Sequence, residues 1–87
     1  MYEISILPSA ARELARLDKS VGNRIVRRLR WLGENLENIS PEPFSGDLAG
    51  LFKLRVGDYR VIYQILRHEK LLVIHSIGHR RDVYRRS

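Results

Sequence analysis

The chain has 87 residues, of which 16 are Lys or Arg and 10 are Asp or Glu, so its formal net charge is +6. A chain of this length can close one modest hydrophobic core, which predicts a single domain over residues 1–87. It contains no cysteine, which excludes disulfides, thiolate metal sites and a cysteine nucleophile. The amino-terminal segment has an acidic residue at position 3 and no long apolar run, which predicts a soluble, cytoplasmic protein.

The first half of the chain predicts a strand followed by two helices. Apolar and polar residues alternate over residues 2–7, as in a short strand that ends at Pro8-Ser9. Residues 10–17 repeat apolar side chains at helical spacing. A longer helix is expected over residues 21–36, where one apolar stripe recurs. Trp31 is expected to pack beside that stripe, and contact with a partner is the alternative.

The second half predicts a loop and then a meander of strands. Residues 38–50 concentrate turn-forming Pro, Gly, Asn and Ser, so regular structure should stop there. Strands are expected over residues 51–56, 59–66 and 71–77, and the tail after them can form a helical turn or an extended arm. The order β-α-α-β-β-β indicates an α+β fold with a helical hairpin on one face of a small antiparallel sheet.

The positive charge is concentrated where these strands lie. Residues 1–50 carry seven basic and seven acidic side chains, whereas residues 51–87 carry nine basic and three acidic ones. Arginine predominates, and its planar guanidinium can hold two phosphate oxygens at once. The distribution therefore predicts a polyanionic partner.

Side-chain alternation along the strands should gather several cations on the sheet face opposite the helices. The candidates are Lys53, Arg55 and Arg60, joined by Arg80 and Arg81 just beyond the last strand. Half-exposed sheet faces also carry Lys and Arg merely for solubility. Charge alone therefore indicates a partner and not a reaction.

Cleavage of RNA by its own 2′-hydroxyl needs a proton acceptor, cations around the charged transition state and an acid for the leaving 5′-oxygen. Tyr84 and His79 are the proton-transfer candidates beside the arginine pair. A tyrosine near a chain end also commonly packs by its ring. His75 is interpreted as structural and His68 as solvated. No His or carboxylate spacing predicts a metal site, so no metal or cofactor is expected.

Two segments carry a resemblance to a known family: residues 54–63, LRVGDYRVIY, and residues 77–84, IGHRRDVY. Together with the leading strand, the first helix and the approach to the sheet, they resemble the RelE branch of the RelE/ParE toxin superfamily. This resemblance implies one RelE-like toxin domain over residues 1–87 and a metal-independent endoribonuclease that cuts mRNA in the ribosomal A site. It also implies an acidic, RelB-like antitoxin partner, with which the toxin can form a heterotetramer.

The same resemblance assigns roles to individual residues. Arg60 and Arg80 would hold the scissile phosphate, Lys53 would aid binding and charge or proton balance, and Tyr84 would act in proton transfer. The further RNA-binding candidates are Arg55, Arg81 and Arg85. This chain departs from the branch at Leu51, where a further lysine is expected. His79 also replaces a lysine, so that it can share the acid–base role.

Two alternatives remain open. ParE-like members of the superfamily resemble this fold but act on DNA gyrase without cutting RNA, and a non-catalytic RNA- or ribosome-binding module would keep the same charge. The joint presence of Lys53, Arg60, Arg80 and Tyr84 favours the nuclease, because a gyrase inhibitor has no evident need for a phosphate-binding cleft.

Overall fold

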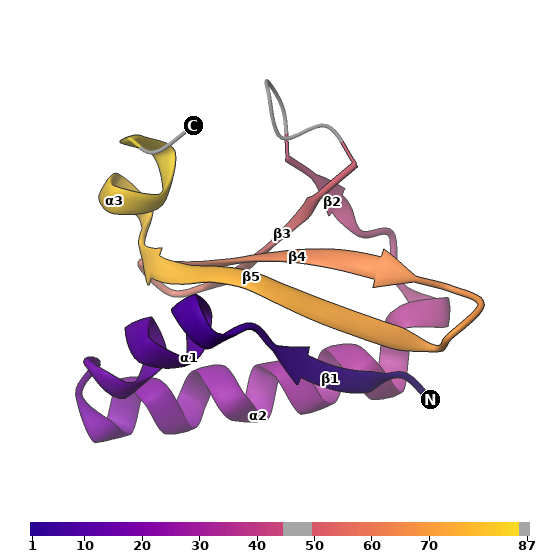
Figure 1. Cartoon of the computed structure of the whole chain (residues 1–87), viewed down its shortest axis with the longest axis horizontal. Coiled ribbons are helices and arrows are strands. Elements are labelled where there is room, and N and C mark those ends of the chain that lie inside the picture. The colour runs from indigo at the N-terminus through magenta and orange to yellow at the C-terminus, as the bar shows by residue number, and fades with distance from the viewer. Residues whose placement is uncertain (45–49, 86–87) are drawn as a thin grey trace.

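Five strands form one sheet in the order β1-β5-β4-β3-β2, and α2 runs along one face of it (Figure 1). The computed structural model describes residues 1–44 and 50–85. The elements are β1 (Glu3–Ile6), α1 (Pro8–Ala15), α2 (Lys19–Asn35), the 3-10 turn η1 (Leu36–Asn38), β2 (Glu42–Pro43), β3 (Phe52–Val56), β4 (Tyr59–Leu66), β5 (Leu71–His79) and α3 (Arg80–Arg85). The α+β class and the β-α-α-β-β-β order are confirmed.

The sheet differs from the expected antiparallel one at its edges. β3, β4 and β5 form the predicted antiparallel meander, but β1 pairs with β5 in parallel. Alternation in β1 decides which side chains face the core and leaves the direction of pairing open. The segment expected to be irregular also contains η1 and the two-residue strand β2, which pairs with β3. Residues 45–49 of that segment lie outside the described part of the chain.

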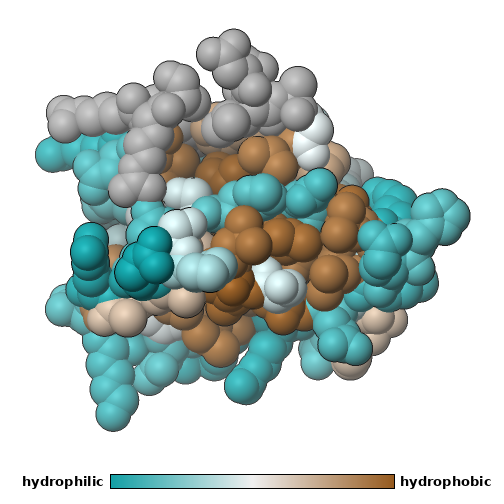
Figure 2. All heavy atoms as spheres, in the orientation of Figure 1, coloured by the Kyte–Doolittle hydropathy of each residue, from teal (hydrophilic) through white to brown (hydrophobic). Residues whose placement is uncertain are grey.

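The apolar stripe of α2 packs on the sheet and forms most of the core. Ile25, Leu29 and Leu32 are fully buried against strand residues such as Tyr63 and Ile74. Burial raises the pKa of the Tyr63 hydroxyl to about 12, because the ionised form loses its water. Seen from the side shown in Figure 2, apolar side chains gather over the middle of the sheet and hydrophilic ones surround them.

Trp31 does not pack into this core, so that expectation was wrong. Its side chain is 38% exposed and lies under the Arg28 guanidinium, whose central carbon is 4.5 Å from the indole centre. Position 31 lies outside the apolar stripe of α2, because Leu29 and Leu32 occupy the buried side of that helical turn.

Within residues 1–44 and 50–85, no helix is long and apolar enough to cross a membrane.

A carboxylate from α1 completes the edge of β5 that β1 leaves open. β1 pairs with Leu71 to Ile74 only. Beyond that point, Glu13 accepts hydrogen bonds from the backbone N–H of Ile77 at 3.0 Å and from the Ser76 hydroxyl at 3.4 Å. These bonds satisfy a strand amide that would otherwise lack a partner strand. They fix α1 beside the carboxyl-terminal half of β5.

Candidate functional site

The sheet face opposite α2 brings three of the predicted cations together. Lys53 is the cross-strand partner of Ile62, and Arg55 is the partner of Arg60. Paired residues in adjacent strands share a face, so Lys53, Arg55 and Arg60 project from the same side. Leu54 and Val56 lie between them in sequence and are buried in the core on the other side. The predicted separation of β3 into an apolar and a cationic face is confirmed.

Arg60 is held rigidly at the turn between β3 and β4. It is only 9% exposed, and its Nη1 donates hydrogen bonds to the carbonyls of Gly57 at 2.8 Å and Tyr59 at 2.9 Å. Its Nε is buried and has no hydrogen-bond partner among the described residues. Buried donors normally have a partner. An anion at this place would supply an acceptor and compensate the charge.

Lys53 and Arg55 share one carboxylate. Glu42 Oε2 lies 3.4 Å from Lys53 Nζ and 3.1 Å from Arg55 Nη2. The hydrogen bond from Arg55, and then the one from Lys53, hold the pKa of the Glu42 carboxyl below its ordinary value, although partial burial opposes this shift. Glu42 was not among the residues predicted for the site. Its only signal was its place between two prolines, and its pairing with Lys53 depends on the strand β2 that was not expected.

α3 carries the next candidates over the same face. The backbone N–H of Arg80 donates to the Asp58 carbonyl at 2.8 Å, which ties the start of α3 to the turn that holds Arg60. Val83 is buried against Phe44 and Ile62, and a Cβ on Gly78 would stand 3.4 Å from Val83 Cγ2. Val83 therefore holds α3 against the end of β5 at ordinary contact distance.

The structure describes the side chains of only some of the candidate residues in α3. Arg80 and Arg81 are exposed. The side chains of Tyr84 and Arg85 lie outside the described residues, although their backbone belongs to α3. The parts assigned to Arg80, Arg81, Tyr84 and Arg85 stay predictions.

His79 faces away from the cationic cluster. It pairs with Tyr59, packs edge-on against that ring with the ring centres 5.6 Å apart, and accepts a hydrogen bond from the Arg81 N–H at 3.3 Å. Tyr59 packs against the core on the α2 side. A β-bulge in β5 places His79 on the α2 side. Ile62 pairs with Ser76, but the next residue, Tyr63, pairs with Ile74, so His75 has no cross-strand partner in β4. Beyond this extra residue, the side chains of β5 alternate in the opposite phase.

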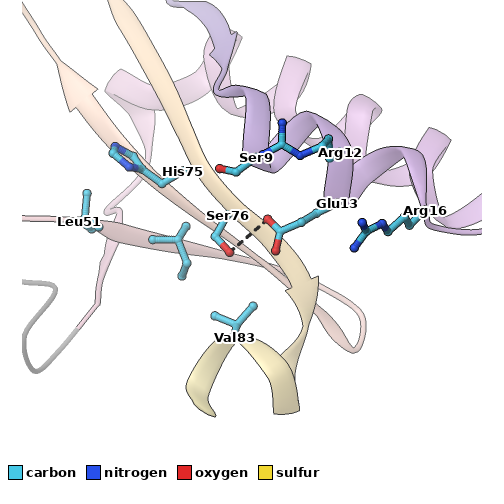
Figure 3. A pocket seen from close by; sticks show the side chains of 9 residues that line it. Ser9, Arg12, Glu13, Arg16, Leu51, His75, Ser76 and Val83 are labelled. Carbon is cyan, nitrogen blue, oxygen red and sulfur yellow. Dashed lines mark hydrogen bonds between the residues drawn. The ribbon is translucent and has the colours of Figure 1, made fainter. Parts of the chain in front are cut away.

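A groove of about 460 Å³ runs beside this face, between α1, β5 and α3 (Figure 3). Arg12 and Glu13 of α1 line one side together with Arg16, which directly follows the helix, and Val83 of α3 reaches toward the groove from the other side. His75 also lines it, and its Nε2 lies 3.1 Å from Gln64 Oε1. No sequence pattern predicts this groove, because it depends on how α1 packs against β5.

These features define a small basic α+β protein with a cluster of cationic side chains on one face of its sheet. Residues 4–84 match the family model described as ParE toxin of type II toxin-antitoxin system, parDE. Toxin RelE of Mycobacterium tuberculosis is 35% identical over 85 residues, which cover 97% of this chain and 87% of the relative. The chain belongs to the RelE/ParE family of toxins of type II toxin–antitoxin systems.

Solved structures agree with this assignment. The toxin–antitoxin complex RelBE2 from Mycobacterium tuberculosis contains a chain that superposes with a TM-score of 0.80 at 26% identity, covering 90% of this chain and 96% of that one. The isolated Escherichia coli RelE toxin superposes with a TM-score of 0.75 at 16% identity, covering 99% of this chain and 98% of that one. The second likeness shows the fold alone.

Proposed function

We propose that this toxin is an endoribonuclease that cuts mRNA in the ribosomal A site. The observation that carries the proposal is the buried Arg60 guanidinium, which is fixed by two backbone carbonyls and whose Nε–H has no acceptor among residues 1–44 and 50–85. Lys53 and Arg55 lie on the same face, and α3 begins beside them. A rigid cationic site of this kind suits the charged transition state of phosphodiester cleavage.

The proposed reaction is internal transesterification. The 2′-oxygen attacks the adjacent phosphorus while the bond from phosphorus to the 5′-oxygen breaks, which leaves a 2′,3′-cyclic phosphate and a 5′-hydroxyl. Arg60 and Arg80 hold the phosphate and stabilise its added charge, and Lys53 assists through its own charge. Tyr84 takes part in the proton transfer, in which the 2′-hydroxyl loses one proton and the leaving 5′-oxygen gains one, so that the charge balances over the reaction. The orientation of His79 toward Tyr59 gives it no direct route to the Arg60 face, which favours Tyr84 for this role.

Primer extension on a defined message tests the proposal. The message is incubated with the toxin in the presence and in the absence of programmed ribosomes. Cuts that appear only with ribosomes and map to the A-site codon are the expected result. An intact message, with the toxin folded and present, would reject the nuclease.

The second candidate is inhibition of DNA gyrase, which the match to a model named for ParE toxins favours. A supercoiling assay with purified gyrase separates the two functions. Loss of supercoiling together with an intact message would assign this chain to the gyrase-directed class. Unchanged supercoiling with A-site cuts would assign it to the nucleases.

We further infer that an acidic, RelB-like antitoxin binds this chain. The net charge of +6 and the apolar surface over the middle of the sheet support such a partner (Figure 2), since a disordered acidic segment can wrap a small basic domain. The test mixes the toxin with the product of the small reading frame adjacent to its own. A complex at micromolar concentration is expected, and its absence would count against the pairing.

Removal of the Glu42 carboxylate should strengthen RNA binding. Glu42→Gln removes the negative charge that Lys53 and Arg55 share. Affinity for a short labelled RNA at low salt should rise about two- to fivefold, because an exposed ion pair is worth about 0.2–1 kcal/mol. Fluorescence anisotropy measures the change. The control, Glu69→Gln, removes an equal charge from the exposed β4–β5 turn, and an equal rise there would attribute the effect to net charge alone.

A further inference from the structure

A second hollow, of about 240 Å³, lies between the carboxyl-terminal half of α2 and the edge formed by β2 and β3. Leu54 and Tyr63 contribute apolar lining, whereas Arg28, Lys53 and Arg55 contribute positive charge. Lys53 and Arg55 belong to the cationic face that holds Arg60. Lys53 and Arg55 therefore line this hollow and also lie on the face proposed for cleavage.

Trp31 is the aromatic side chain of this hollow that remains accessible. It lines the hollow while 38% exposed, and the Arg28 guanidinium lies 4.5 Å from its ring centre. More than a third of this residue's surface therefore stays open to a ligand. Together, an accessible aromatic ring, a stacked arginine and neighbouring cations make the combination that binds single-stranded RNA, by base stacking and phosphate contact.

We infer that this hollow binds one nucleobase of the RNA strand beside the scissile phosphate, stacked on Trp31. The inference rests on the proposed function and adds a subsite to it. Lys53 and Arg55 stand two residues apart in β3, about 7 Å along the strand, and they lead the backbone from Arg60 to the hollow. An acidic peptide would satisfy the cations, whereas an RNA strand would satisfy them and also offer a base to the exposed part of the indole, so RNA fits better.

Fluorescence provides a direct test, because Trp31 is the only tryptophan in the chain. The probe is a short single-stranded RNA with 2′-O-methyl groups, which lacks the nucleophile and cannot be cut. Saturable quenching of Trp31 emission is expected on titration at low salt. Unchanged emission up to millimolar RNA would overturn the inference. Quenching by an acidic antitoxin peptide but not by RNA would overturn it as well and assign the hollow to protein.

Variants separate stacking from charge. Trp31→Ala should weaken binding of the same RNA about tenfold, in the range found when a stacked aromatic is removed, and Trp31→Phe should retain most of the affinity. Arg27→Ala serves as the control, since it removes an exposed cation of α2 that does not line the hollow. Equal affinities of Trp31→Ala and the parent protein would reject the subsite.

The outcome for the subsite is distinguishable from the outcome for the nuclease. A parent protein that cuts mRNA on ribosomes, with Trp31→Ala cutting at the same KM, would remove the subsite and leave the nuclease. A parent protein whose emission is quenched by RNA but that cuts no message would keep the subsite and remove the nuclease.

Discussion

Arg60→Ala should lower mRNA cleavage by on the order of a hundredfold or more. The guanidinium is fixed to the carbonyls of Gly57 and Tyr59 before substrate arrives, so it needs no reorganisation as charge develops on the phosphate. Removal of one such preorganised donor typically costs this much in rate. Single-turnover primer extension on programmed ribosomes measures the loss.

Two controls accompany this variant. The first is Arg55→Ala, at the cross-strand partner of Arg60. The Arg55 side chain is 63% exposed and paired with Glu42, so its loss should reduce the cleavage rate only a few-fold. Circular dichroism must show Arg60→Ala folded at the assay temperature, because the two lost hydrogen bonds also contribute about 1 kcal/mol each to stability. A folded Arg60→Ala that cuts at the parental rate would exclude this arginine from the reaction.

Gly33→Ala should destabilise the fold by about 1–3 kcal/mol, the usual cost of forcing extra atoms into a packed site. A Cβ at this position would meet the Tyr2 carbonyl oxygen at 2.7 Å. The neighbouring backbone is fixed as well, since the Tyr2 N–H donates to the Gly33 carbonyl at 3.0 Å. The clash therefore pushes the start of β1 away from α2. The free energy of unfolding in urea reports the loss.

Gly22→Ala is the matched control in the same helix. A Cβ there would approach Leu14 Cδ1 at 3.8 Å, which is ordinary contact. Alanine should then stabilise α2 by about 0.5–1 kcal/mol, because glycine loses more backbone entropy in a helix. Equal effects of the two substitutions would show that the approach of Tyr2 to Gly33 does not constrain the fold.

Local rules predicted the elements and the cationic face. Alternation along β3 and β4 is a property of each strand, so Lys53, Arg55 and Arg60 could be placed together without knowledge of the rest of the chain. The spacing of apolar residues in α2 predicted its buried side in the same way. Both patterns depend on residues a few positions apart.

Features that depend on contacts between residues far apart in the sequence were not predicted. The bulge at His75 arises from the pairing of β4 with β5, and it reverses the face on which His79 lies. The partnership of Glu42 with Lys53 and Arg55 requires β2 to pair with β3 across the main loop. The hollow beside Trp31 requires α2 and β3 to meet. None of these relations leaves a periodic signal in the sequence.

The most direct test of the proposed chemistry uses a message with a single 2′-deoxynucleotide on the 5′ side of the A-site cleavage position. The attacking oxygen is then missing, while codon pairing and phosphate contacts remain. The proposed mechanism predicts that programmed ribosomes yield no cut at that position, whereas the all-ribose message is cut. Cleavage of the deoxy message at the same rate would contradict internal attack and require a different nucleophile.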